Sequence, residues 1–514
     1  MGIKRYIADK DNVITNAYQS NLVTRGTGSN MGLASSLEVF SIYAQATSAS
    51  VEKARTIVQF PITSSEISGI PTILSDRTAG TIPASGSVDF FLKVYNVATD
   101  QTLPRNFTLV VSPLSQSWEE GSGIDLDNYT DLTYGGTGSN WINARATTPW
   151  VDINGDEVNG GSYLSASWSG SPLTDYDEFN YRQTFGEKGT GDVEINITGL
   201  VEQWVKGTAA SGFDNFGAII KLTGSQESAR RSYYTKRFSS RSSEYFFSRP
   251  VIEARWDDST KDNRGNFIVS SSALSSANNL NTIYLYNYYR GQPADLAPVD
   301  GDKVVYVSVF NLTASGVQLS TSPNDPVTGG WVSTGVYTAS FALNTTASVV
   351  YDRWFSTGTV GAGVDDADSV IYHTGTIKPQ VFDSENRFYI PRYVTTIQNL
   401  EDAYRRNDIV RLRLFTRLKN WNPNIYTVAS TDIQNSFVEN AYYKVYRIID
   451  NKEVIAYGTG SLNCTRLSYD VSGSYFDLDM SLLEENYSYG IKFSHYINGV
   501  YKEQAATFKF RVDQ

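Results

Sequence analysis

The amino-acid sequence predicts an all-β protein: an N-terminal jelly-roll-like sandwich with one short helix, followed by two smaller immunoglobulin-like β-sandwiches. The composition supports this class, because Tyr and Phe are abundant, at 34 and 24 of 514 residues, and aromatic residues favour strands. Short apolar runs with alternating polarity also recur along the whole chain, and loops rich in Gly, Ser, Asp and Asn separate them.

The first domain is predicted at residues 1–257. Its expected strands are short, as in SVDFFLKVYNV and NFTLVVSPL, and long polar loops join them, which is typical of a jelly roll. The next stretch, 258–281, is rich in Ser and Asn and poor in large apolar residues. We interpret it as a polar linker or an extended surface arm.

Two further domains are predicted at 282–392 and 393–514. In the first of them, runs such as KVVYVSVFNL and GVYTASFAL are spaced as in an immunoglobulin-like sandwich. In the second, Asn498-Gly499 lies between two alternating runs, and this dipeptide favours a tight hairpin turn. Both domains are therefore expected to be small β-sandwiches.

One segment departs from the β pattern. In INITGLVEQWVKG (195–207) the apolar residues recur at intervals of three and four, which predicts an amphipathic helix at 198–206. Thr198 is expected to act as its N-cap, and Gly207 to end it in a left-handed conformation. We expect Trp204 to be buried on the apolar face.

Charge and apolar content exclude several classes of protein. The net charge of −11 opposes binding to nucleic acid. The sequence contains no run of about 18 apolar residues, so no membrane-spanning helix is predicted. The N-terminal stretch lacks the apolar core of a secretory signal, so we expect synthesis in a cytosol without export. The single Cys464 has no second cysteine for an internal disulfide.

Few residues are suited to catalysis. The two histidines, His373 and His495, lie in different predicted domains, whereas a catalytic triad needs a histidine beside its nucleophile. Zinc sites usually draw on several His or Cys ligands. We therefore expect no enzymatic activity and no zinc.

The stretch SWEEGSGIDLDNYTD (117–131) concentrates carboxylates. Three of them are candidate calcium ligands: Asp125, Asp127 and Asp131. Calcium is the one cofactor that the sequence suggests. A solvated loop is the alternative interpretation. In a third, acids of this stretch pair as glycosidase acids, a role that depends on their separation and environment. The candidates for this pair are Glu119, Glu120, Asp125, Asp127 and Asp131. Nearby DINGDE (152–157) lacks the glycine and final glutamate of an EF-hand loop, so we predict a hairpin turn there.

Aromatic residues accompany the same loops. Four of them are candidate glycan-binding residues: Trp118, Tyr129, Trp141 and Trp150. Exposed aromatic faces of this kind stack on sugar rings. Aromatic residues buried in a core would give the same composition, so packing is the alternative interpretation.

The order of motifs in the first domain is distinctive. RTIVQFPI, SWEEG, SNW, VEINITGLVEQWVKG and DNFGAIIKL are followed by FSSRSSEYFFSRPVIEARW. This order resembles the DNRLRE-domain family and related carbohydrate-binding jelly rolls. The matching positions are Thr198, Val201, Trp204, Gly207, Asn215, Gly217, Phe238, Ser240, Arg241, Glu244, Arg249 and Pro250. The resemblance implies that the helix caps one end of the sandwich. It also implies structural roles for six residues: Thr198, Trp204, Gly207, Gly217, Arg241 and Pro250.

Passages along the whole chain carry a second resemblance. TRGTGSNMG, NLNTIYLYNYYRGQ, LFTRLKNWNPNIYTVAS and YGTGSLNCTRLSYDVSGSYFDLDMS are similar to segments of uncharacterised virion structural proteins of tailed phages, chiefly contractile-tailed phages of marine bacteria. This resemblance implies a non-enzymatic component of a virion, in the neck, the tail or an appendage of the capsid surface. Its partners would be other virion proteins, in an oligomeric arrangement, with synthesis in the host cytoplasm.

Two other functions stay open at the level of sequence. The chain could be an adhesin that binds a host surface glycan through the jelly roll, which is compatible with a place in the particle. It could also be a polysaccharide-degrading enzyme that uses the acids of WEEGSGIDLD. In none of these interpretations do we expect a nucleic acid or a membrane as the partner.

Overall fold

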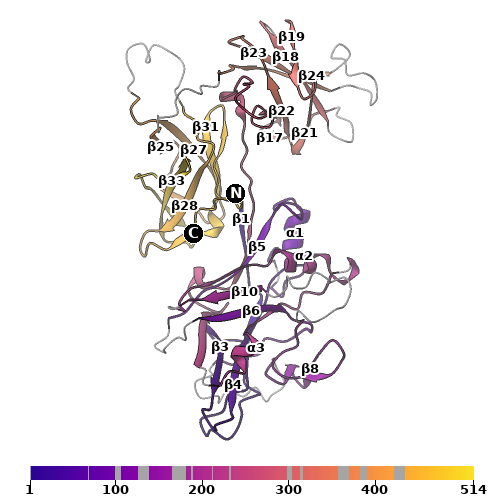
Figure 1. Ribbon diagram of the computed structural model, residues 1–514, viewed down its shortest axis with the longest axis vertical. Helices are drawn as coiled ribbons and strands as arrows, with labels where there is room; N and C mark the ends of the chain where they lie inside the picture. Colours follow the sequence, from indigo (N-terminus) through magenta and orange to yellow (C-terminus); the bar gives the residue numbers. More distant parts are fainter. Residues whose placement is uncertain are drawn as a thin grey trace. The chain divides into compact units, whose positions relative to one another are not determined.

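The computed structural model describes residues 2–67, 69–98, 106–124, 138–164, 181–186, 189–210, 212–230, 233–297, 304–312, 316–356, 370–381, 391–421 and 435–514. The chain divides into two compact units, Gly2–Asp257 and Asp258–Gln514, called here the N-terminal and C-terminal units (Figure 1). Strands make up most of the regular secondary structure of both units, which confirms the all-β prediction. Within the described residues, no helix is both long enough and apolar enough to cross a membrane.

The N-terminal unit is a sandwich of two sheets. The first has the order β1-β14-β5-β11: Ile3–Ile7, Val251–Arg255, Asp89–Val94 and Val193–Asn196. The second has the order β10-β6-β12-β4-β3-β13: Tyr181–Phe185, Phe107–Pro113, Ala218–Leu222, Val51–Gln59, Ser36–Tyr43 and Tyr233–Ser239. In addition β2 (Lys10–Thr15) pairs with β4.

The strand pairs of this unit are nested along the chain. From the outside inward, β1 pairs with β14, β4 with β12, β5 with β11 and β6 with β10, all antiparallel. A further nested pair, β3 with β13, lies just inside the first one. The pairs of β1 and β5 belong to the first sheet, and those of β3, β4 and β6 belong to the second. A long hairpin rolled up into two sheets produces this pattern, which is the topology of a jelly roll. The predicted jelly-roll fold is confirmed.

The core of this unit lies between the two sheets. Strand β5 illustrates how the sequence builds it: Phe90, Leu92 and Val94 are fully buried, whereas the residues between them are only partly covered. This period of two places alternate side chains on opposite faces of the sheet. The apolar positions of the other strands join them in a single cluster that also includes Trp204.

Helix α2 (Thr198–Lys206) has the predicted bounds, and Trp204 is buried with 1% of its surface exposed. The predicted N-cap is wrong, because Thr198 is the first helical residue and Ile197 occupies the cap without a side-chain hydrogen bond. The Thr198 hydroxyl instead accepts the N–H of Phe90 in β5 at 2.8 Å, which ties the helix to the first sheet. Gly207 ends the helix with φ +64°, the sign of φ expected there.

The prediction of one helix is incomplete. Helix α1 (Ile73–Thr78) has a capping box formed by Thr72 and Ser75, and α3 (Gly224–Glu227) is capped by Thr223. At six and four residues, these helices are too short for an apolar period to be recognised in the sequence. Short 3-10 turns complete the described helical structure: η2 (Thr208–Ala210), η3 (Phe246–Ser248), η4 (Asn263–Gly265) and η6 (Met480–Leu482).

The C-terminal unit contains two sandwiches. In the first, called the middle sandwich, the strand order is β15-β22-β21-β18-β23-β24: Asn281–Tyr286, Val336–Leu343, Val327–Ser333, Val305–Asn311, Val350–Ser356 and Val370–Ile377. The first residues of β21 pair with β18 and its last residues with β22, so the sheet folds over a common core. Short strands border it: β16 (Tyr288–Tyr289), β17 (Gln292–Pro293), β19 (Gln318–Leu319) and β20 (Thr321–Ser322).

The second, C-terminal sandwich has two separate sheets. One has the order β25-β27-β31-β30: Tyr393–Ile397, Ile409–Leu418, Gly473–Asp479 and Ser468–Asp470. The other has the order β26-β34-β32-β28-β29, with β33 paired to β32: Ala403–Arg405, Phe508–Asp513, Ser488–Ile497, Ala441–Arg447, Glu453–Ile455 and Val500–Glu503. The predicted hairpin turn is confirmed, because Asn498 and Gly499 have φ +52° and +78° between β32 and β33.

The segment 258–281, interpreted as a polar linker or a surface arm, is anchored on both sandwiches of the C-terminal unit. Lys261 pairs in parallel with Tyr469 of the C-terminal sandwich, and Phe267 is fully buried in the core of the middle sandwich. The polar side chains of this segment include amides that form hydrogen bonds with its backbone N–H and carbonyl groups. The side chain of Asn281, for example, binds both the N–H and the carbonyl of Ile268, at 2.8 Å each. The segment therefore joins the two sandwiches of the C-terminal unit.

Candidate functional site

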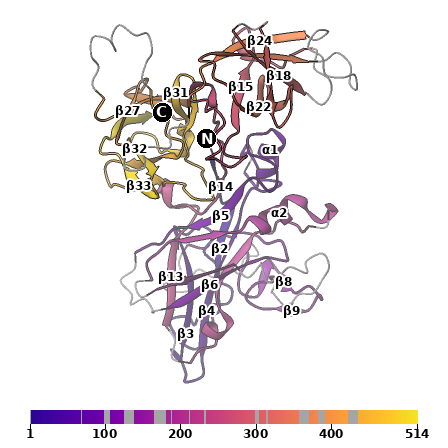
Figure 2. The ribbon, with the colours of Figure 1, turned by 45° about the horizontal axis from the view of Figure 1, so that its top comes forward.

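The loops in which the sequence placed its candidate residues cover the second sheet of the jelly roll. Strand alternation points Ile14, Ile57 and Ile219 away from the main core, and a separate apolar cluster packs on them. The cluster includes Trp118, Trp141 and Trp150, and we call it the tryptophan layer. A small sheet supports it: β7 (Asn143–Arg145), β8 (Thr148–Val151) and β9 (Glu157–Val158). Figure 2 shows β8 and β9 side by side on one flank of the unit.

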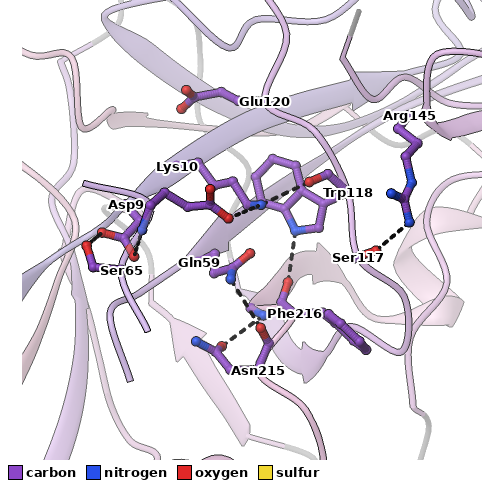
Figure 3. A network of polar contacts seen from close by, with 12 residues as sticks. Asp9, Lys10, Gln59, Ser65, Ser117, Trp118, Glu120, Arg145, Asn215 and Phe216 are labelled. Atoms are coloured by element: carbon purple, nitrogen blue, oxygen red, sulfur yellow. Dashed lines mark hydrogen bonds and ion pairs between the residues drawn. The ribbon is translucent and has the colours of Figure 1, made fainter. Parts of the chain in front are cut away.

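Three of the four predicted glycan-binding aromatics are buried. The exposed fractions are 2% for Trp118, 8% for Trp141 and 0% for Trp150. The indole N–H of Trp118 donates to the carbonyl of Phe216 at 2.8 Å (Figure 3), and that of Trp150 to the carbonyl of Asn140 at 2.9 Å. Rings in these positions have no free face for a sugar, so their assignment as glycan-binding residues is wrong. Tyr129 lies outside the described residues.

Polar contacts fasten the edge of the tryptophan layer to the sandwich (Figure 3). The ammonium of Lys10 lies 5.0 Å from the ring centre of Trp118 and donates to the carbonyl of the same residue at 2.9 Å. The side-chain amide of Asn215 donates to the carbonyl of Phe60 at 2.7 Å, and the backbone carbonyl of Asn215 accepts the side-chain amide of Gln59. These contacts bring together residues that are far apart in the sequence, and they restrain the layer.

Glu120, one of the candidate acids, forms an ion pair with Arg241. The guanidinium donates two hydrogen bonds to the carboxylate, at 2.6 and 2.5 Å. Glu120 also accepts the N–H of Asp11 at 2.9 Å, while Asp11 accepts the N–H of Arg241 at 2.6 Å. Burial raises the pKa of Asp11 to about 7. A carboxylate held by a bidentate Arg is positioned to stabilise the fold rather than to exchange protons with a substrate.

The calcium prediction is not tested by the described residues. Asp125, Asp127 and Asp131 lie outside them, and no group of three or more potential metal-ligating side chains occurs in the part of the chain that is described. The predicted turn at 152–157 is confirmed. The Asp152 carboxylate accepts the N–H groups of Asn154 and Asp156, and the turn joins β8 to β9.

The two histidines lie in separate sandwiches. His495 is buried in the C-terminal sandwich, where burial lowers its pKa to about 4 and its ring nitrogens lie near Thr395 and Gln504. It is therefore neutral at physiological pH. His373 is exposed on β24 of the middle sandwich.

The residues that the resemblance marked as structural have clear roles. A Cβ at Gly217, where φ is +85°, would lie 2.2 Å from the carbonyl oxygen of Val58, so only glycine fits against β4. The carbonyl of Pro250, just before β14, accepts the N–H of Ala8 at 3.0 Å. Together with Trp204 and Arg241, these residues hold the sandwich closed.

Two clefts accompany these buried groups. In the N-terminal unit, a cleft of about 520 Å³ lies beside Arg55, Asn154, Asn159, Ser162 and Tyr163, and we call it the Tyr163 cleft. The ammonium of Lys221 lies 4.5 Å from the ring centre of Tyr163, so a cation covers one face of this ring.

In the C-terminal unit, a second cleft of about 290 Å³ lies next to the segment that joins the two sandwiches, and we call it the seam cleft. Six of its residues are Asp262, Arg264, Tyr284, Tyr286, His373 and Asp470. The sequence alone does not reveal this site, because its residues come from four separate stretches of the chain. The exposed aromatic pattern of YLYNYY (284–289) is the one local signal that it offered.

Neither a family model nor a curated protein matches this sequence. Among solved structures, a marsupial T cell receptor matches 45% of this chain and 68% of its own, at 7% identity and a TM-score of 0.16. A chimeric titin Z1Z2 carrying a decorin peptide matches 46% of this chain and 89% of its own, at 15% identity and a TM-score of 0.14. The match to E. coli alpha-2-macroglobulin covers 99% of this chain but 26% of that protein, at 9% identity and a TM-score of 0.14. At these scores no relationship follows.

Proposed function

We propose that this protein is a non-enzymatic structural component of a tailed-phage virion, located in the neck, the tail or an appendage of the capsid surface. It is made in the host cytoplasm and assembles with other virion proteins, in several copies. Neither nucleic acid nor membrane is its partner. The proposal starts from the resemblance of the sequence to virion proteins.

One observation carries the non-enzymatic part of the proposal. Glu120, in the stretch richest in carboxylates, is held by two hydrogen bonds from Arg241 and is not poised for proton transfer. The neighbouring tryptophans support the same reading, because they are packing groups. Glu120, one of the acids that a polysaccharide-degrading enzyme would use, thus stabilises the fold through Arg241.

An edge strand supports the assembly part of the proposal. Strand β24 ends the order of the middle sheet, and its pairing in the described chain is with β23. Its first residues, Val370 and Ile371, expose 44% and 51% of their surface. An edge of this kind presents unpaired backbone groups to which a strand of a neighbouring protein can add.

Mass spectrometry of density-purified particles tests the proposal. Peptides of this chain should co-purify with the major capsid protein at a constant ratio across the particle band. Their absence from the band would overturn the proposal.

Particles grown with an Ile371→Lys variant test the edge strand separately. This variant should be incorporated several-fold less than Ile449→Lys, a matched change at a position that exposes 76% of its surface in a turn of the C-terminal sandwich. Equal incorporation of the two variants would assign assembly to another surface.

A further inference from the structure

The seam cleft has a wall of aromatic rings. Tyr284 and Tyr286 project from the same face of β15, two residues apart, and their rings stack with centroids 6.1 Å apart and an interplanar angle of 19°. Tyr286 exposes 37% of its surface. An open aromatic ring of this kind offers a π-face on which the C–H groups of a ligand can pack.

Polar side chains around this wall are held in place by their own partners. Arg264 binds Asp352, which is fully buried, through two hydrogen bonds of 2.6 and 2.7 Å. Gly375 makes room for this pair, since a Cβ there would lie 2.5 Å from the guanidinium. Because rigid groups lose little freedom when a ligand arrives, such a pair favours binding at a preformed site.

The opposite side of the cleft comes from the C-terminal sandwich. Arg413 donates to both oxygens of Asp470, at 2.9 and 2.8 Å, and the N–H of Ser472 donates to the same carboxylate at 2.8 Å. The carboxylate, the hydroxyl of Ser472 and the imidazole of His373 therefore place acceptors and donors around one space. A polyhydroxylated ligand requires this mixture.

The charges in the cleft disfavour an anionic ligand. Arg264 is neutralised by Asp352 and Arg413 by Asp470. Asp262, which is 2% exposed, is a further acid. Its carboxylate accepts the backbone N–H of Arg264. Among these lining groups no excess of positive charge is available for an anionic ligand.

We propose that the seam cleft binds a neutral saccharide unit of a surface glycan, packed on Tyr286 and hydrogen-bonded by Asp470, Ser472 and His373. Its volume of about 290 Å³ is at the lower end of the range for ligand pockets, which fits a terminal sugar or a short segment. In the larger Tyr163 cleft, the ammonium of Lys221 already lies over one face of the tyrosine ring. This inference does not depend on the proposed virion assignment.

The test uses the full chain on a printed array of neutral, amino and acidic oligosaccharides. Titration calorimetry with the neutral oligosaccharide that binds best then gives the Kd. Tyr286→Ala should weaken binding about tenfold or more, and His373→Ala several-fold. Tyr245→Ala is the matched control, because this tyrosine of the N-terminal unit exposes 68% of its surface and lies outside the cleft.

A blocking variant keeps the test independent of stability. Val471 exposes 56% of its surface at the rim, so Val471→Trp should fill the cleft and abolish binding while the thermal unfolding curve stays unchanged. Binding to neutral oligosaccharides that is lost in these variants and kept in Tyr245→Ala supports the proposal. Absence of binding to every neutral oligosaccharide, binding to acidic ones alone, or binding that survives Tyr286→Ala and Val471→Trp would overturn it.

Discussion

The tryptophan layer and the seam cleft contain the same kinds of residue, aromatic rings and Arg–carboxylate pairs, but use them differently. In the layer, Trp118 and Trp150 are covered on all sides and Arg241 fastens the loop that carries Glu120. In the cleft, the pair between Arg264 and Asp352 is buried below a surface on which Tyr286 stays open. Composition therefore does not distinguish a ligand site from a packed core. The exposed fraction of the aromatic rings does.

The largest expected difference between the two regions is in stability. Trp150→Ala should lower the free energy of unfolding by about 3–5 kcal/mol, as should Trp204→Ala, because each removes a fully buried ring. Tyr286→Ala, at a half-open ring, should cost about 1 kcal/mol or less. Urea denaturation measures all three. A cost below about 1 kcal/mol for Trp150→Ala would return this residue to the candidates for binding.

The two regions also differ in pH dependence. Burial raises the pKa of Asp11 in the layer to about 7 and that of Asp262 in the cleft to about 6, from 3.8. The folded state therefore binds more protons than the unfolded state between pH 3.8 and those values. The stability that each protonated carboxyl contributes is complete at low pH and is lost as the pH rises through this window.

Asparagine substitutions should remove these slopes. Between pH 4 and 7, Asp11→Asn should remove a loss of unfolding free energy on the order of 3 kcal/mol. Asp262→Asn should remove a smaller loss, between pH 4 and 6. Urea denaturation at each pH gives the profiles, and hydrogen exchange read by mass spectrometry assigns each change to its unit. Profiles parallel to that of the wild type would mean that folding raises the pKa of neither carboxyl.

Each region also has a glycine that is closely packed, against a backbone carbonyl in the jelly roll and against an ion pair beside the cleft. Gly217→Ala in the jelly roll and Gly375→Ala beside Arg264 should each cost about 1–3 kcal/mol, because the added Cβ meets atoms at 2.2 and 2.5 Å. Gly330→Ala is the control, since nothing lies within 4 Å of its Cβ. Equal thermal stability of all three variants would show that the neighbours move aside freely.

A small effect is expected at Cys464, which is buried in the C-terminal sandwich. Cys464→Ser keeps the volume and should cost about 1–2 kcal/mol for burying a hydroxyl, without loss of folding or assembly. Thermal unfolding and particle incorporation measure this. A loss of folding would point to a role of the thiol that packing does not explain.

Local patterns in the sequence predicted local structure well. The helix at 198–206, the buried Trp204 and the hairpin turn at Asn498 all depend on periodicity or turn chemistry within a few residues. The order of motifs also predicted the jelly roll. The N-cap role of Thr198 was wrong because its hydroxyl binds Phe90, which is 108 positions away.

Long-range contacts explain what the sequence could not predict. Glu120 and Arg241 are 121 positions apart, and Arg264 and Asp352 are 88 apart, so neither pair can be recognised from spacing. The anchoring of the segment 258–281 could not be predicted for the same reason, since Lys261 pairs with Tyr469 on a distant strand. The burial of Trp150 likewise depends on contacts with strands of the second sheet.

The central claim is that the acids and tryptophans of the N-terminal unit hold it together instead of acting on a substrate. A double-mutant cycle with Glu120→Gln, Arg241→Gln and the double variant, followed by urea denaturation, tests it most directly. The account predicts a coupling free energy of about 1.5–3 kcal/mol, the range for hydrogen bonds to charged groups. A coupling near zero, together with release of reducing sugar from a host polysaccharide by the wild type but not by Glu120→Gln, would contradict it.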